Sequence, residues 1–166
     1  RLKSLCDDYG YSLKNLAAPG TLLRDRPREA VTFVENHDVA RSHPILHDKV
    51  LAYALVLTHE GYPCVFWQDY FNLGLGQPES PNGIAALVRV HEGHAGGRSY
   101  VLYADDDLYV MQREGFERQR GLVLAVNNRG DRWNGIRVRS KWPNTRFNAG
   151  AWGGWDLSRP GEEVSD

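Results

Sequence analysis

The stretch Phe33-Val34-Glu35-Asn36-His37-Asp38 decides how the first part of this 166-residue chain folds. It follows Ala30-Val31-Thr32, so β-branched and aromatic residues run directly into a group of polar side chains. Such an apolar run is typical of a buried β-strand. In parallel sheets and (β/α) barrels, ligands bind where the strands end. The pattern therefore predicts a strand over residues 30–34 that ends in a binding or catalytic turn.

A second strand with the same kind of ending follows a helix. Apolar residues from Ile45 to Thr58 recur at helical spacing, and Gly61 closes the segment. The short apolar run Pro63-Cys64-Val65-Phe66-Trp67 then breaks into Gln68-Asp69. The order strand, helix, strand predicts one parallel βαβ unit. We expect its two polar strand ends to lie side by side at one edge.

The remaining patterns divide the chain into two parts. Residues 1–9 are predicted as a helix that Gly10 ends, and Ile84 to Gly93 as another helix. Beyond Gly96-Gly97, short β-rich runs alternate with turn residues, at 99–103, 108–112, 122–126 and 136–139. We therefore predict an α/β part, residues 1–97, followed by an antiparallel all-β domain, residues 98–166.

The α/β part is too short to be a complete domain of its class. One βαβ unit cannot cover both faces of its sheet, and an eight-stranded (β/α) barrel takes about 250 residues. The sequence begins with Arg1 rather than Met, and its first residues have no secretory signal pattern. We expect residues 1–97 to be a segment of a larger α/β domain.

Composition excludes several classes of function. With 42% apolar and 25% charged residues and a net charge of −1, the chain is that of an ordinary soluble protein without a basic field for nucleic acid. Its longest apolar window, Leu51 to Leu57, is far shorter than the roughly 20 residues that cross a bilayer. Cys6 and Cys64 both stand in apolar surroundings, which favours buried thiols over a disulfide. Neither nucleic acid nor a membrane is expected as a partner.

These stretches resemble the α-amylase family of glycoside hydrolases. Residues 33–38 are similar to the end of its seventh barrel strand, where a Phe and then Asn-His-Asp recur. Residues 61–69 are similar to its eighth strand, a Gly-x-Pro followed by an aliphatic-aromatic run. The β-rich part from Ser99 onward, including Asn148-Ala149-Gly150, resembles the antiparallel domain after the barrel. The resemblance implies an incomplete (β/α)8 TIM-barrel segment, about strands 7 and 8, followed by a truncated antiparallel β-domain.

The resemblance also implies roles for single residues. Asp38 matches the third catalytic carboxylate, which is neither nucleophile nor acid but stabilises the oxocarbenium-like transition state through sugar hydroxyls. His37 matches an imidazole that donates to sugar hydroxyls. Asn36 is also a candidate for substrate binding, although it is expected mainly to orient the turn. The structural alternatives are a helix N-cap for Asp38 and a turn histidine for His37.

The implied reaction is retaining cleavage of α-1,4-glucosidic bonds in starch-like glucans. It needs a nucleophile and a general acid/base, which the family places upstream, on strands four and five. We therefore expect this chain alone to be inactive, with the missing N-terminal barrel portion in the same or another chain, and a secreted or periplasmic location. Two alternatives stay open: a non-catalytic α-glucan-binding or stability module, and a family member with transglycosylase activity.

Further residues near the second strand end are candidates for substrate binding. Trp67 and Tyr70, with Phe71, offer rings on which glucose can stack, although packing between barrel and loop explains them as well. Asp69 either binds hydroxyls at the rim or holds the loop. The family's usual Gly before this acidic residue is Gln68 here.

Other polar and aromatic residues suggest a metal or a surface glucan site. Asp107 and Asn128 occupy places comparable to a calcium site of some amylases, and Asp105 and Asp106 add carboxylate oxygens. The alternative is a solvated turn. His43 and His47 have the spacing of a metal pair on a helix but lack a third ligand. Tryptophans of the C-terminal part are candidates for starch binding or for packing: Trp133, Trp142, Trp152 and Trp155.

Overall fold

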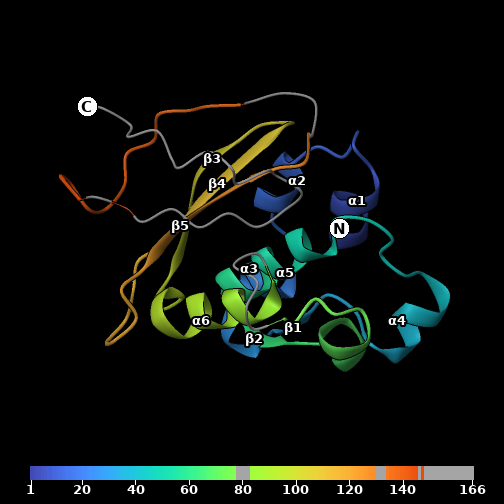
Figure 1. Ribbon diagram of the computed structural model, residues 1–166. Helices are drawn as coiled ribbons and strands as arrows, with labels where there is room; N and C mark the ends of the chain where they lie inside the picture. Colours follow the sequence, from blue (N-terminus) through green and yellow to red (C-terminus); the bar gives the residue numbers. More distant parts are fainter. Residues whose placement is uncertain (78–82, 130–133, 146, 148–166) are drawn as a thin grey trace.

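The computed structural model describes residues 1–77, 83–129, 134–145 and 147. The helices are α1 (Leu2–Asp7), α2 (Lys14–Ala17), α3 (Leu22–Asp25), α4 (His37–Ser42), α5 (Lys49–Thr58) and α6 (Ile84–His94), with the short helical segments η1 (Pro27–Glu29) and η2 (Gln68–Asn72). The strands are β1 (Val31–Phe33), β2 (Tyr62–Cys64), β3 (Ser99–Ala104), β4 (Leu108–Arg113) and β5 (Leu122–Asn127). In Figure 1, α3, α5 and α6 gather around β1 and β2, and the twisted sheet of β3, β4 and β5 lies above them.

The first two strands form the predicted parallel pair. Val31 pairs with Tyr62 and Phe33 with Cys64, while α4 and α5 connect the strands. Both strands are shorter than expected. The predicted burial of β1 is wrong, because Val31 is 61% exposed and Phe33 40% exposed; Tyr62, the partner of Val31 in β2, is 63% exposed. Parallel strands are normally covered on both faces; here no described residue covers the face that Val31, Phe33, Tyr62 and Cys64 share.

The helix expected from Ile45 begins only at Lys49. Asp48 has a left-handed backbone (φ 45°) and separates α5 from the preceding loop. His43 ends α4 and His47 lies in that loop, so they do not form the helical pair that their spacing suggested. Gly10 is likewise no left-handed cap, since α1 ends at Asp7 and its C-cap, Asp8, has extended backbone.

The second half contains the predicted antiparallel sheet, in the order β3-β4-β5. The expected fourth strand at 136–139 is wrong: these residues have no strand pairing, and Ile136 is 45% exposed. The central strand β4 is buried along its whole length. Gln112 accepts a hydrogen bond from the Lys141 amide (2.9 Å), so the chain near residue 141 lies against β4.

One hydrophobic core joins both halves. It contains Tyr53 and Leu87 from the helices and Tyr109 and Met111 from β4. The ring of His59 contacts the Tyr109 hydroxyl (2.9 Å) in this core. Helices and an antiparallel three-stranded sheet therefore pack directly on each other, and the division at residues 97 and 98 stays a prediction.

The cysteines and the helices test two further expectations. Cys6 and Cys64 are both free, as expected, but only Cys6 is buried. Cys64 is exposed because it lies on the uncovered face of β1 and β2. In the ranges that the structure describes, no helix has the length and apolar character needed to span a membrane.

Candidate functional site

The turn after β1 is organised by Asn36. Its side-chain oxygen accepts hydrogen bonds from the backbone amides of Asp38 (3.1 Å) and Val39 (2.9 Å), which caps the N-terminus of α4. Asn36 therefore orients the turn as expected. The alternative reading of Asp38 as the N-cap is wrong.

The Asn36 cap leaves the next two side chains at the surface. The side chain of His37 is 71% exposed and that of Asp38 is 78% exposed, with 3.4 Å between Nε2 of His37 and Oδ1 of Asp38. The exposed carboxylate stands in the first turn of α4, where the helix dipole favours negative charge. This pair can accept and donate hydrogen bonds to a ligand without rearrangement of the turn.

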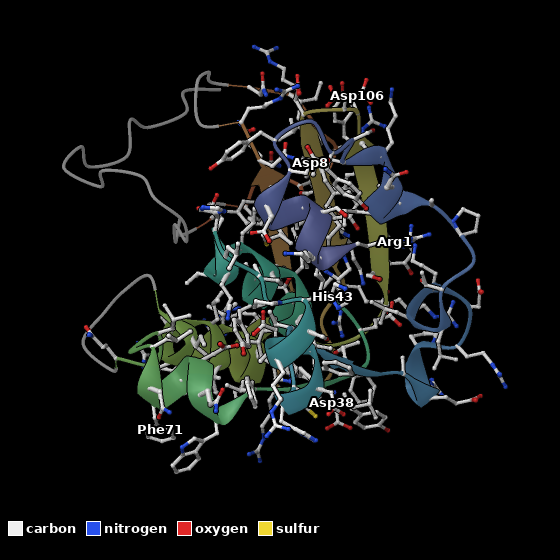
Figure 2. All side chains as sticks on the ribbon, turned by 90° about the vertical axis from the view of Figure 1, so that its right-hand side faces the viewer. Arg1, Asp8, Asp38, His43, Phe71 and Asp106 are labelled. Carbon is white, nitrogen blue, oxygen red and sulfur yellow. The ribbon has the colours of Figure 1, made fainter. Side chains whose placement is uncertain are left out.

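An aromatic cluster follows β2. Trp67 and Phe71 stack with ring centres 4.2 Å apart, and Tyr70 contacts Phe71 at 4.8 Å. The segment is a π-turn, closed by the hydrogen bond from the Leu73 amide to the Gln68 carbonyl (2.9 Å). Trp67 is 66% exposed, so its ring is available for stacking. In Figure 2, Phe71 and Asp38 both lie toward the lower edge of the molecule, opposite Asp106.

A buried ionic network joins the two segments that carry these exposed groups. Nζ of Lys49 is 3.0 Å from Oε2 of Glu35 and 2.8 Å from Oδ1 of Asp69. The second oxygen of Asp69 accepts a hydrogen bond from the Tyr53 hydroxyl (2.6 Å), and that of Glu35 accepts one from the Ile45 amide. Both carboxylate side chains are only 1% exposed.

The charges in this network stabilise one another. Burial opposes a charge on Lys49, but its hydrogen bonds to Asp69 and Glu35 outweigh burial and raise the pKa of the ammonium group. Burial, followed by the hydrogen bond to Asp69, raises the pKa of the Tyr53 hydroxyl far above its ordinary value. Lys49 therefore stays protonated between the two acids, and Tyr53 stays a hydrogen-bond donor.

Asp69 is placed inside this network rather than at the surface beside Asp38. Both of its oxygens are bonded within the chain, so the geometry favours the loop-holding role of the two that the sequence leaves open. Sequence reasoning missed Lys49 and Tyr53 as partners of Asp69. One signal was present: a lysine at the first position of a helix opposes the helix dipole. The expected helix start at Ile45 concealed that signal.

The expected calcium donors Asp107 and Asn128 are both bonded to other residues of the chain. Oδ1 of Asp107 lies 2.9 Å from Nε of Arg129, whose positive charge competes with a metal ion. Asn128 donates to the Tyr11 carbonyl (3.0 Å), and its own side-chain oxygen is buried without a hydrogen-bond partner. Across the described ranges, no three His, Cys, Asp or Glu side chains gather closely enough to hold a metal.

The turn next to these residues is held by bonds within the chain. Asp105 accepts from the amides of Asp107 (2.9 Å) and Leu108 (2.7 Å), and Asp106 bonds Ser12 and Lys14. These bonds are those expected if the aspartates form a turn, which is the alternative to a calcium site. Calcium binding by the chain stays a prediction.

The C-terminal tryptophans lie mostly outside the described residues. This holds for Trp133, Trp152 and Trp155, and for the stretch 148–150. Trp142 is described: its ring packs against Gly121, where any added side chain would collide with it, and contacts Phe147 with ring centres 5.9 Å apart. For Trp142 the geometry favours packing.

Comparison with known proteins supplies related sequences. No family model matches the chain. It is 37% identical over 115 residues to an alpha-amylase of Geobacillus stearothermophilus, which covers 64% of this chain and 21% of that protein. It is 35% identical over 94 residues to an alpha-amylase type B isozyme of Hordeum vulgare, covering 54% and 60%. A glucan 1,4-alpha-maltohexaosidase of Bacillus sp. (strain 707) is 26% identical over 172 residues, covering 89% and 33%.

The matches involve only part of each relative. The chain spans between 21% and 60% of the length of these three proteins. The similarity therefore concerns only the matching region of each relative.

Proposed function

Because this chain belongs to the α-amylase family of glycoside hydrolases, whose C-terminal region it matches, we propose that residues 30–72 form part of the substrate site of a retaining α-1,4-glucan hydrolase. In this proposal β1 and β2 are neighbouring strands, about the seventh and eighth, of a (β/α)8 barrel. Residues 1–97 would belong to that barrel and residues 98–166 to a β-domain behind it.

The observation that carries the proposal is the common placement of two strand ends. β1 and β2 are parallel and hydrogen-bonded, so their C-terminal ends lie at one edge. The Asn36 turn presents Asp38 and His37 after β1, and the cluster around Trp67 follows β2. In parallel (β/α) architectures this edge is where substrates bind.

Asp38 is assigned the role of the transition-state-stabilising carboxylate. Its exposed oxygens are free to accept hydrogen bonds from adjacent hydroxyls of a glucose ring, with His37 beside it as a second polar contact. Such bonds strengthen as the ring distorts toward the oxocarbenium-like transition state, which supplies several kcal/mol. The carboxylate needs to bond the ring only, since it takes no part in the covalent or proton-transfer steps.

The aromatic cluster is assigned to binding. Trp67 presents a large exposed face, and Tyr70 and Phe71 support it from the same turn. The apolar face of a glucose ring buries against such rings at little conformational cost, because aromatic side chains have few rotatable bonds. In this proposal Asn36 holds the turn that carries Asp38, and Asp69 holds the η2 segment that carries the aromatic cluster.

The proposed reaction requires two carboxylates that this sequence does not supply. A nucleophile and a general acid/base about 5 Å apart carry out retaining hydrolysis, and the family resemblance places both on strands upstream of β1. They are assigned to the barrel portion upstream, in the same or another chain. The uncovered face of β1 and β2 supports this assignment, because that is where further barrel strands would pack.

Hydrolysis of a soluble maltooligosaccharide tests the proposal. The purified chain is assayed alone and joined to the upstream coding region, and products are identified by chromatography. We expect no turnover by the chain alone and release of shorter maltooligosaccharides by the longer protein. Turnover by these 166 residues alone would show that the missing carboxylates are not required. Longer products would identify a transglycosylase.

A second candidate function is glucan binding without catalysis. The exposed stack of Trp67 on Phe71 favours it, since this surface needs no catalytic carboxylate. Binding of a soluble α-glucan to the chain, unchanged in an Asp38→Asn variant and abolished in Trp67→Ala, together with an inactive longer protein, would support this function over hydrolysis.

A further inference from the structure

We infer that Lys49 is a positioning residue of this substrate site: its ammonium group ties the strand end that carries Asp38 to the η2 segment that carries the aromatic cluster. The inference deepens the proposed function and rests on it. Lys49 touches no substrate in this account, because it lies beneath the surface with only 12% of its side chain exposed.

The α4 side of the tie needs an anchor. α4 has six residues and none of them is buried, so packing does not fix its orientation. A helix this short is also not stable by itself. The carboxylate of Glu35, directly before the Asn36 cap, accepts from the Ile45 amide beyond the other end of α4. Glu35 thus closes the loop that carries Asp38.

The η2 side has one comparable anchor. Asp69 is the only buried residue of that segment. One of its oxygens bonds Lys49 (2.8 Å) and the other bonds the Tyr53 hydroxyl (2.6 Å). Since Trp67, Tyr70 and Phe71 flank Asp69 in the same turn, the position of this carboxylate determines where the aromatic rings lie.

Lys49 connects the two anchors. It is the sole described cation that bonds both Glu35 and Asp69, and it bridges residues that follow different strands. Without the ammonium group, two buried carboxylates would face a shared space, and repulsion with desolvation would drive one to take a proton or move. The separation between Asp38 and the aromatic cluster would then no longer be held.

The location of Lys49 argues that stability alone does not explain it. At the first position of α5 its charge opposes the helix dipole. Buried ionic groups can often be replaced by apolar residues without loss of stability. The charge of Lys49 thus opposes the helix dipole, yet it joins the two segments that carry the exposed groups, as expected of a positioning residue. Rates depend strongly on such positioning, because a misplacement of 1 Å costs about 100-fold in rate.

The test uses the longer protein with four variants: Lys49→Met, Lys49→Arg, Lys14→Met and Asp38→Asn. Lys14 is the matched control, because it forms an exposed ion pair with Asp106 at the far end of the molecule (Figure 2). For each variant, kcat and KM for a maltooligosaccharide are measured, together with amide hydrogen exchange by mass spectrometry. Folding is checked by thermal melting.

We expect Lys49→Met to lower kcat about 10- to 100-fold with a smaller change in KM. Exchange should rise in 36–42 and 67–73 and stay unchanged in α1 and β4. Lys49→Arg should restore most of kcat, since a guanidinium also bridges two carboxylates. Lys14→Met should match the unmodified protein in every measurement.

A folded Lys49→Met protein with unchanged kcat, or with faster exchange throughout the chain and no rescue by arginine, would overturn the inference. If Lys49→Met does not fold, the Glu35→Gln/Lys49→Met/Asp69→Asn variant replaces it, because it leaves no unpaired buried charge, and the same outcomes apply. Unchanged kcat in Asp38→Asn refutes the proposed function instead, while the exchange pattern still decides whether Lys49 ties the two segments.

Discussion

The side-chain oxygen of Asn36 lies 3.1 Å from the backbone nitrogen of Asp38, so the cap that begins α4 also turns the carboxylate of Asp38 outward. One residue thereby serves local folding and site geometry together. Asn36 satisfies the helix terminus, which leaves Asp38 without that task.

Replacing Asn36 by alanine should lower the free energy of unfolding by about 1 kcal/mol, the usual loss for an N-cap. The amides of Asp38 and Val39 would lose their acceptor. Asn36→Asp should keep most of the stability, because aspartate caps equally well. Urea denaturation followed by circular dichroism measures both. Equal unfolding free energies for Asn36→Ala and the unmodified chain would mean that the cap does not contribute.

Tyr53→Phe should destabilise the chain by about 1–3 kcal/mol, the cost of leaving a buried polar atom without its hydrogen bond. The lost donor is the one that holds Oδ2 of Asp69. The matched control is Tyr62→Phe, since Tyr62 is exposed on β2. Urea denaturation of both variants measures the difference. An effect of the same size in both would contradict the role given to Tyr53.

The stability of the chain should fall between pH 6.5 and pH 4 through His59. Burial lowers the pKa of its imidazole from 6.5 to about 4. The unfolded chain binds this proton as the pH falls through 6.5, whereas the folded chain does not until about pH 4, so protonation favours unfolding. The shift corresponds to about 3 kcal/mol.

Urea denaturation at intervals across this pH range measures the slope. In His59→Gln the slope should flatten, and in His47→Gln, an exposed histidine, it should persist. A slope that is the same with and without His59 would contradict the assignment.

The uncovered face of β1 and β2 should make the isolated chain self-associate. Val31 and Tyr62 present apolar side chains on paired strands, and exposed apolar surface on a strand pair promotes association. A Val31→Lys/Tyr62→Lys variant should shift the chain toward monomer in light scattering. In the longer protein the same changes should lower stability, because the face would be packed there. If the two substitutions stabilised the longer protein, this would contradict the expectation that the face of β1 and β2 is covered there.

The sequence predicts the parts of the fold in which local pattern and packing agree. The parallel pairing of β1 and β2 and the three antiparallel strands belong to this class, since each run has apolar residues that find partners. Residues 136–139 show the converse: their β-forming pattern meets no partner strand.

The ionic network could not be predicted in the same way. Glu35, Lys49 and Asp69 are distant in sequence, and each is of a charged residue type that usually lies at the surface. They meet in the folded chain, where β1 pairs with β2 and Asp48 turns the backbone before α5. Polar residues that meet through tertiary packing leave no periodic signal.

The most direct test of the central claim is the kcat of Asp38→Asn in the longer protein. Loss of several kcal/mol of transition-state stabilisation corresponds to a fall of about 100- to 1000-fold, with folding unchanged because the side chain is exposed. Asp25→Asn in α3, also exposed, serves as the control and should retain full activity. A kcat for Asp38→Asn within about twofold of the unmodified protein would contradict the catalytic role of Asp38. Such a change corresponds to less than about 0.4 kcal/mol in the activation free energy.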